Sequence, residues 1–455
     1  MRRLLLLLCA IVFVDTVLYA VVAPLLPHYA DDLGLSKASA GILLAAYPAG
    51  TLVASLPSGL LAARVGPRRT VLLGLVLLCG ASLAFALGRS ATALDSARLV
   101  QGLAGACTWA GALSWLVTSS PPSRRGELIG TVFGAAIVGA LFGPILGATA
   151  TALGTTPVFG TLTLLIATLT LLAAHEPEPP TTPDALATDD STSSAAPTAL
   201  GVTAAAPSSA PDALATHAAS PAPAPEHIHS AGPGTLASTP PPAPDAPGTP
   251  PRTTAQPASL RATLASRRVR LGMWLVVIPG LGFGVLDVLV PLRLDHLGVG
   301  QAGIAATFLI AAAGEALLSP LVGRVADRHG PGRPIRAGLI ASALLVLLIP
   351  VPDTAPLTII LMVLATGAFG IFWAPSMSML SAAAERIGTH QGIAFGLVNL
   401  AWAAGMVTGA AGGGALAKST SDAVPCIVLA AICLATFAAR PRPDTPGGEP
   451  TPAHP

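Results

Sequence analysis

The chain has 455 residues, of which 52% are hydrophobic and only 10% are charged. Water-soluble domains carry about 25% charged residues, so this chain cannot cover a surface that faces water, and lipid must be its solvent. The formal net charge of +2 gives no reason to expect nucleic acid as a partner. The sequence contains no metal-ligand cluster, nucleophile elbow or phosphate-binding loop, so we expect neither an enzyme nor a cofactor or metal.

The cysteines all fall in apolar runs and form no CxxC pair. They are Cys9, Cys79, Cys107, Cys426 and Cys433. We interpret them as packing residues rather than as disulfide partners or metal ligands.

The first apolar run imitates a secretory signal peptide, because two arginines precede a stretch of leucines. The run continues through Asp15 to Pro27, which is long enough to span a bilayer. Leu8 before Cys9 also spoils a lipoprotein cleavage site. We therefore predict a first transmembrane helix and not a cleaved leader.

Apolar runs long enough to span a bilayer follow one another with short polar breaks. We predict spans near 4–27, 38–63, 70–88, 93–118, 127–150, 155–174, 271–294, 301–326, 334–351, 355–381, 391–416 and 422–439. Open sheet edges cannot lie in lipid, so these runs must be helices. The prediction is an all-α membrane protein with 12 transmembrane helices in two six-helix bundles, at residues 1–174 and 270–440.

The two bundles are separated by residues 175–269, which are rich in Pro, Ala, Thr and Ser. Such a segment cannot bury enough apolar surface to offset the entropy of ordering, so we predict a disordered linker. A small folded domain is the alternative. We predict disorder also for the tail at 441–455.

Basic residues predict the orientation. Of the 24 Lys and Arg residues, 19 fall on the side of Met1 if the spans alternate in direction, and Arg98 lies within a span. The four on the opposite side are Lys37, Arg89, Arg293 and Lys418. The positive-inside rule then places both termini and the linker in the cytoplasm.

The two halves repeat, because residues 27–69 overlay residues 291–333. The matched pairs include Pro27 with Pro291, Asp31 with Asp295, Gly34 with Gly298, Gly59 with Gly323, Arg64 with Arg328, Gly66 with Gly330, and Arg69 with Arg333. Apolar helices aligned by chance would match Leu and Ala rather than this set. Parallel repeats of six helices, with the site between the halves, are the architecture of major facilitator transporters.

Two loops carry related motifs that we expect to act in gating. Their residues are Gly59, Ala63, Arg64, Gly66, Arg68 and Arg69 in the first half, and Gly323, Asp327, Arg328, Gly330 and Arg333 in the second. They resemble the major facilitator superfamily signature Gly-x-x-x-Asp-Arg-x-Gly-Arg-Arg. Ala63 replaces the signature's acid, so a cytoplasmic latch would depend on Asp327, against Arg124 or Arg125. Plain positive-inside loops are the alternative.

Two further motifs lie inside predicted spans. Arg98-Leu-Val-Gln-Gly102 resembles the family's Arg-x-x-x-Gly signature in the fourth helix, and snorkelling of Arg98 to the outer surface is its alternative. The fifth helix carries Gly130, Gly139, Gly143, Pro144 and Gly147. This spacing resembles the signature of the antiporting, drug-exporting branches, and an ordinary glycine packing face is the alternative.

The first helix, from Asp15 through Tyr19 to Pro24 and Pro27, is similar to that of the 12-helix drug:proton antiporters, which include vesicular monoamine transporters. The resemblance covers everything except the linker and tails. It implies a cavity lined by helices 1, 4, 7 and 10. Asn399 stands where the monoamine transporters show an acid, which argues against monoamine specificity.

Three acids lie inside predicted spans: Asp15, Asp287 and Glu315. Asp15 lies about 18 Å along its helix, near mid-membrane, where a carboxylate must be paired, hydrated or protonated. We hypothesise that Asp15 is the main proton-coupling or cation-binding group and that Arg98 tunes it. Structural hydrogen bonding is the alternative.

The other candidate residues support this acid. Asp287 would be a second acid from the opposite half, with a structural role as its alternative. Glu315 is a further candidate for proton coupling or substrate binding, and a structural or gating role is its alternative. Tyr19 lies on the face of Asp15 and could stack on a ligand. Four tryptophans are candidates for lining the pocket or for packing: Trp109, Trp115, Trp373 and Trp402.

The sequence therefore predicts a proton-coupled exporter of small amphipathic or cationic compounds in the plasma membrane. Its partners would be a small-molecule substrate, protons and the lipid bilayer, and we expect a monomer. An exporter or importer of sugars, amino acids or other metabolites is one alternative, although its polar substrates would favour more polar residues within the spans. A sensor that has lost transport is another, because of Ala63 and the long linker.

Overall fold

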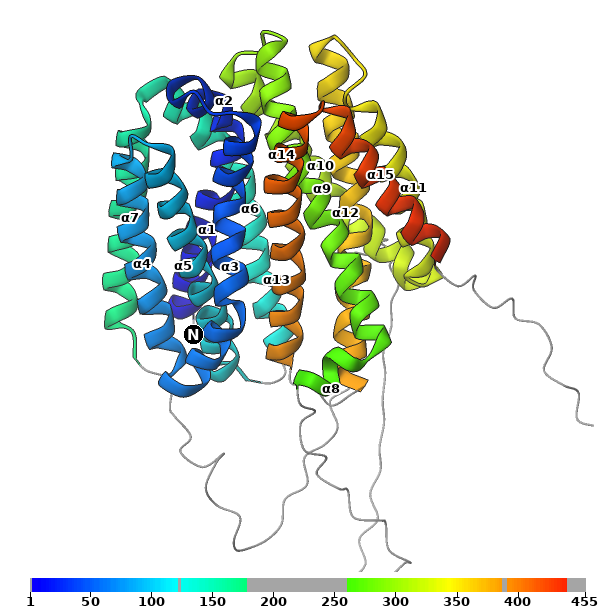
Figure 1. The fold of residues 1–455 in the computed structure, drawn as a ribbon. Helices are drawn as coiled ribbons and strands as arrows, with labels where there is room; N and C mark the ends of the chain where they lie inside the picture. The colour runs from blue at the N-terminus through cyan, green and yellow to red at the C-terminus, as the bar shows by residue number, and fades with distance from the viewer. Residues whose placement is uncertain (1, 122–123, 178–259, 387–390, 440–455) are drawn as a thin grey trace, which may run out of the picture. The chain divides into compact units, whose positions relative to one another are not determined.

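The computed structural model describes residues 2–121, 124–177, 260–386 and 391–439. Every regular element in these ranges is helical (Figure 1). Most of the predicted linker and the whole predicted tail lie outside the described residues, so their disorder stays a prediction.

The first half begins with two consecutive helices that share the first predicted span. Its helices are α1 (Arg2–Ala20), α2 (Val22–Leu33), α3 (Lys37–Val65), α4 (Pro67–Leu87), α5 (Ala91–Ser119), α6 (Arg125–Leu153) and α7 (Thr155–His175). Val21 separates α1 from α2. Pro24 has no backbone N–H, so the carbonyl of Ala20 loses its usual partner at this break.

The second half repeats the pattern. Its helices are α8 (Leu260–Ala265), α9 (Arg267–His296), α10 (Gln301–His329), α11 (Gly332–Leu348), α12 (Ala355–Arg386), α13 (Gln391–Val407), the π-helical turn η2 (Thr408–Gly412), α14 (Gly413–Ser419) and α15 (Ala423–Ala439). Helix α8 and the start of α9 occupy the end of the range predicted as linker. Each predicted span overlaps one helix or one run of consecutive helices.

Many of these helices have the length and composition of membrane spans. Within the described residues, eight helical stretches are long and apolar enough to cross a bilayer, and two shorter apolar helices lie at Ala355–Ile371 and Ala423–Ala439. Large apolar side chains also face outward: Leu164 is 71% exposed and Leu317 is 76% exposed. Such an outer surface is stable in lipid and not in water.

The turns confirm the repeat at the level of the backbone. Gly66 and Gly330, which are matched in the sequence, have φ of 96° and 78°. L side chains rarely adopt this region, so glycine permits the sharp reversal between the second and third spans of each half. Gly34 and Gly298, another matched pair, also have positive φ.

Helix pairing is the same in both halves. In the first half α1 packs on α6, α3 on α5, and α4 on both α5 and α7. The repeat-related pairs in the second half are α9 with α13, α10 with α12, and α11 with both α12 and α15. The predicted pair of pseudo-symmetric six-helix bundles is therefore confirmed.

The two halves meet along two equivalent seams. Helix α3 packs against α13, η2 and α14, and α6 packs against α10. Figure 1 shows α3 in blue beside α13 and α14 in orange. Both halves belong to one compact unit.

Candidate functional site

One face of α5 forms the surface against which the other residues of the candidate site pack. Arg98, Gly102, Gly105 and Trp109 recur at helical spacing and share this face. A Cβ added at Gly105 would lie 2.5 Å from the Tyr47 hydroxyl, and one added at Gly102 would collide with the Tyr47 carbonyl oxygen. The two glycines therefore create the notch in which Tyr47 of α3 is seated.

Asp15 of α1 is held above this notch and is only 1% exposed. Its Oδ2 accepts hydrogen bonds from Trp109 Nε1 at 2.9 Å and from the Tyr47 hydroxyl at 3.1 Å. Its Oδ1 is buried and has no partner among the described residues. A buried carboxylate oxygen without a partner is costly, and a proton on the carboxylate would remove the buried charge.

Arg98 is equally buried but does not contact Asp15 directly. It donates to the carbonyl oxygens of Leu18 at 2.8 Å and Tyr19 at 3.4 Å, and to Gln101 Oε1 at 3.0 Å. These two carbonyls lie in the last turn of α1, where a cation is favoured by the helix dipole. The guanidinium carbon also lies 4.8 Å from the centre of the Tyr47 ring. Arg98 is 1% exposed, so its side chain lies among the helices in this arrangement.

Tyr19 connects the two halves. Its ring centre lies 5.3 Å from that of Tyr47 and 5.4 Å from that of Trp402 on α13. Its hydroxyl donates to Met406 Sδ at 3.9 Å. Tyr19 and Trp402 are both half-buried. An aromatic cluster of Tyr19, Tyr47 and Trp402 therefore joins α1 and α3 of one half to α13 of the other.

The second half contributes two carboxylates, Asp287 on α9 and Glu315 on α10, and both are half-buried. Their charges act on each other and on the Tyr19 hydroxyl. Glu315 packs across α12, because a Cβ at Gly370 would lie 2.9 Å from its Cγ. Neither carboxylate has a hydrogen bond or ion pair among the described residues, whereas Asp15 has Tyr47, Trp109 and nearby Arg98.

Asn399 lies on the same face of α13 as Trp402 and Met406, at spacings of three and seven residues, and it is exposed. The other tryptophans differ in their surroundings. Trp109 binds Asp15, and Trp115 is buried in the core. Half-buried Trp373 packs against a buried cluster that includes Val276 and Leu397.

The glycines of the fifth span pack against the helix that carries Asp15. A Cβ at Gly139 would lie 2.6 Å from the Phe13 oxygen, one at Gly143 2.5 Å from Ala20 Cβ, and one at Gly147 3.1 Å from Pro24 Cγ. Pro144 is buried in α6, which continues through it. Gly130 meets nothing within 4 Å. Three of the four glycines therefore allow α6 to approach α1 and α2.

The second half replaces the proline by a π-helical turn. Ala410, the counterpart of Pro144, lies within η2. Side chains at Gly405 and Gly409 would collide with the carbonyl oxygens of Val277 and Leu281 on α9. Turns of this kind distort a helix locally, and here the distortion occurs where the chain is held between α9 and α3.

The predicted gating loops lie at the opposite ends of α3 and α10 from Lys37 and Gln301. Arg64, Arg328 and Arg333 are exposed, and a Cβ at Gly59 or Gly323 would meet nothing within 4 Å. The half-buried Arg68 donates to the carbonyl oxygens of Ala173 and Ala174, which ties α4 to α7.

The predicted cytoplasmic latch stays a prediction. Arg124 forms an ion pair with Glu127 of α6, with atoms 2.9 Å apart. The side chains of Asp327 and Arg125 lie outside what the structure describes.

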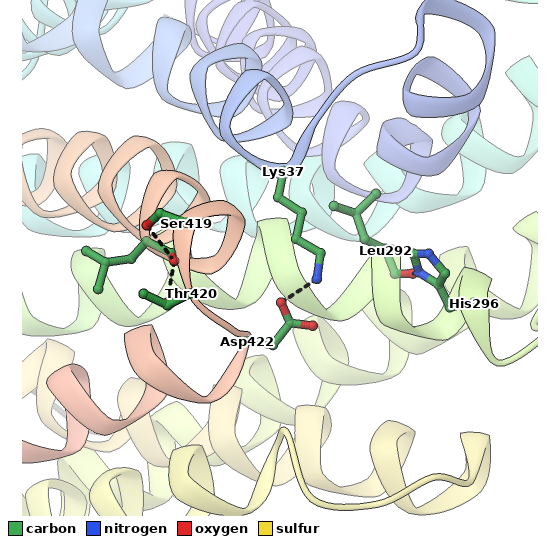
Figure 2. Close-up of polar contacts among 7 residues, drawn as sticks. Lys37, Leu292, His296, Ser419, Thr420 and Asp422 are labelled. Atoms are coloured by element: carbon green, nitrogen blue, oxygen red, sulfur yellow. Dashed lines mark hydrogen bonds and ion pairs between the residues drawn. The ribbon is translucent and has the colours of Figure 1, made fainter.

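At the other end of the bundle, an ion pair joins the two halves. Figure 2 shows Lys37, at the start of α3, reaching Asp422 in the connection from α14 to α15, with Nζ and Oδ1 2.5 Å apart. Beside it, side chains at Gly41 and Gly414 would collide with the backbone oxygens of Ala410 and Lys37.

Sequence reasoning identified Asp15, Arg98 and Tyr19 but not Tyr47, which touches all three. A signal was present in the spacing of Arg98, Gly102, Gly105 and Trp109, because two glycines on the face of a buried arginine leave space for a large neighbour. That neighbour's identity depends on the packing of α3 and α5, which no local pattern in the sequence specifies.

Known proteins are similar to this chain in sequence and in fold. The family model for the Major Facilitator Superfamily matches residues 8–312 and 272–455. An "MFS-type transporter ppzB" from Metarhizium majus is 33% identical over 141 residues, which cover 30% of this chain and 31% of that protein. The "Quinolone resistance protein NorA" of Staphylococcus aureus is 25% identical over 164 residues, or 35% of this chain and 42% of that protein.

The alignments therefore span less than half the length of these curated relatives. Among solved structures, a crystal structure of a mutant of the nucleoside transporter NupG superposes with a TM-score of 0.64 at 11% identity, covering 96% of this chain and 98% of that one, which shows a shared fold. The family match, the paired six-helix halves and the repeated glycine turns agree: the chain belongs to the major facilitator superfamily of membrane transporters.

Proposed function

We propose that this protein exports small amphipathic or cationic compounds across the plasma membrane in exchange for protons. The buried Asp15 carboxylate carries this proposal, with one oxygen held by two donors and the other left without a partner among the described residues. A group in that setting binds a proton readily, because a proton removes the unfavourable buried charge. The resistance protein named above supports efflux as the direction.

The acids divide their roles in this proposal. Asp15 is covered by Tyr47 and Trp109, so an organic cation has no access to it in the present arrangement. Asp287 and Glu315 are half-buried and have no basic partner among the described residues, and the Tyr19 ring lies within range of their charges. They therefore attract the substrate cation, while Asp15 takes up and releases the proton.

In this proposal, transport proceeds by alternating access, in which the two halves move relative to each other. The halves are joined at one end by Lys37 and Asp422 and at mid-depth by Tyr19 and Trp402. We propose that these contacts separate when the halves rock about the central site, which exposes it to the other side of the membrane. The glycine faces of α6 and α13 allow α1 and α9 to move as units with their bundles.

The orientation follows from the distribution of basic residues. We propose that Met1, the linker and the Arg64 and Arg328 loops are cytoplasmic, and that the Lys37–Asp422 pair lies on the outer side. The arrangement described here is then closed toward the outside. Proton entry from outside would require the Lys37–Asp422 contact to open.

An accumulation assay tests the proposal. Cells that express the protein should accumulate less ethidium than cells with an empty vector, and an uncoupler should abolish the difference. Asp15→Asn should abolish it as well, while Asp353→Asn, at an acid whose side chain is 98% exposed, should leave it intact. Efflux that is unaffected by the uncoupler, or wild-type efflux by Asp15→Asn, would contradict proton coupling through this residue.

A further inference from the structure

Tyr47 occupies a position that links three otherwise separate parts of the site. Its hydroxyl donates to Asp15 Oδ2 at 3.1 Å, Arg98 lies over its ring at 4.8 Å, and the ring contacts Tyr19 at 5.3 Å. It is 5% exposed, so it cannot bind substrate directly in this arrangement. Among the described residues, no other side chain makes contacts of these three kinds.

The position of Tyr47 is fixed by its surroundings. Gly102 and Gly105 of α5 lie so close to its backbone and hydroxyl that any side chain there would displace it. Arg98 is itself held by two carbonyls of α1 and by Gln101. The Tyr47 ring therefore cannot move freely with the Asp15 carboxylate. A change in the charge of Asp15 must then alter the hydrogen bond to the Tyr47 hydroxyl or shift the Tyr47 ring.

A continuous series of contacts leads from Asp15 to the opposite half. The hydroxyl of Tyr47 binds the carboxylate, its ring contacts Tyr19, and Tyr19 contacts Trp402 and Met406 on α13. Trp109 binds the same carboxylate oxygen but contacts Phe133 of its own half, with ring centres 5.5 Å apart. Tyr47, unlike Trp109, therefore belongs to the series of contacts that reaches the opposite half.

We propose that Tyr47 is a positioning residue that links the charge of Asp15 to the Tyr19–Trp402 contact between the halves. This inference rests on the proposed function, since it assumes that Asp15 changes charge during the cycle. A hydroxyl binds an ionised carboxylate more strongly than a protonated one, because charge-assisted hydrogen bonds are stronger. Loss of the charge releases the Tyr47 hydroxyl, and the Tyr19 and Trp402 rings, which meet edge to face, are then free to separate.

The test compares variants of the full-length protein in proteoliposomes, with ethidium transport driven by an imposed pH gradient. Tyr47→Phe removes the hydroxyl and keeps the ring, so we expect turnover to fall about tenfold while KM changes less than about twofold. Trp109→Phe is the matched control, because it removes the other donor without breaking the path to Trp402. We expect it to lower turnover by less than Tyr47→Phe.

Introducing Tyr47→Phe into the Asp15→Asn variant distinguishes a positioning role of the Tyr47 hydroxyl from a role in packing. The transport rate in this variant is measured as downhill ethidium flux. A neutral amide does not change charge, so adding Tyr47→Phe should change this flux by less than about twofold. Equal losses in both backgrounds, or a wild-type turnover for Tyr47→Phe alone, would overturn the inference. If Asp15→Asn itself shows wild-type pH-driven transport, the proposed function fails instead.

If the ethidium flux of a variant is too low to measure, its thermal unfolding midpoint in detergent provides a second test. Tyr47→Phe should lower the unfolding midpoint in the Asp15 background and change it less with Asp15→Asn, because the bond to the charge is already lost. Equal shifts in the two backgrounds would again overturn the role of the hydroxyl.

Discussion

Lys37 Nζ lies 2.5 Å from Asp422 Oδ1, and this ion pair joins the first turn of α3 to the connection between α14 and α15 (Figure 2). The two side chains are 33% and 23% exposed, so solvent screens their attraction and the pair contributes about 1 kcal/mol at most. A contact of this strength can hold the halves together at this end and still open in each transport cycle.

Reversing one charge of this pair should favour opening at the Lys37 end. Lys37→Asp or Asp422→Lys alone places like charges together, and we expect transport to fall about twofold to fivefold, in line with a weak surface pair. The double variant restores opposite charges and should recover most of the rate. Ethidium flux in proteoliposomes measures all three. An additive loss in the double variant would show that the two residues act independently.

Gly105→Ala should disrupt the candidate site directly. The added Cβ would lie 2.5 Å from the Tyr47 hydroxyl and 3.0 Å from Asp15 Oδ1, so one of these groups must move. We expect transport to fall at least tenfold, with destabilisation of about 1–3 kcal/mol. Gly160→Ala on α7, where nothing lies within 4 Å, is the control. Transport and unfolding midpoints measure the two effects, and equal behaviour of the two variants would contradict the packing described.

Two glycines of the same motif should respond oppositely to alanine. At Gly143 the new Cβ would meet Ala20 Cβ at 2.5 Å, whereas at Gly130 it would meet nothing within 4 Å. We expect Gly143→Ala to destabilise the protein by about 1–3 kcal/mol, because α6 must move away from α1. Gly130→Ala should be neutral or stabilising by up to about 1 kcal/mol through helix propensity. Unfolding midpoints in detergent compare them, and the reverse order would refute this packing of α6 on α1.

Arg98→Lys should be poorly tolerated although it keeps the charge. A lysine offers one point charge where the guanidinium reaches Leu18, Tyr19 and Gln101 and lies over the Tyr47 ring. We expect a clear loss of stability and at least a tenfold loss of transport. Arg333→Lys, at an exposed position, should have little effect on stability. Wild-type stability of Arg98→Lys would mean that the carbonyl contacts at the end of α1 contribute little.

Much of the fold could be predicted from the sequence, because the apolar runs exceed bilayer thickness and the repeated Gly, Pro, Asp and Arg positions relate the halves. The break at Val21 and the π-helical turn at Thr408–Gly412 were not predicted. Both depend on how a helix fits against its neighbours: the second occurs where Ala410 replaces the proline of the first half and is pressed against Gly41.

The site was predicted in part. An acid and an arginine within apolar spans are conspicuous, since each must have a compensating environment in lipid. The sequence alone led us to expect Arg98 to act on Asp15, whereas the structure inserts the Tyr47 ring near both and directs Arg98 to the carbonyls of α1. A tyrosine in an apolar helix has no distinctive pattern, so only the packing of α3 against α5 reveals it.

The most direct test of the account is proton movement measured during transport. Purified protein in liposomes that contain a pH-sensitive dye should move protons when ethidium is added on one side, and Asp15→Asn should abolish proton movement while retaining downhill ethidium flux. Proton movement by Asp15→Asn at the wild-type rate would contradict the central claim that this buried carboxylate carries the coupled proton.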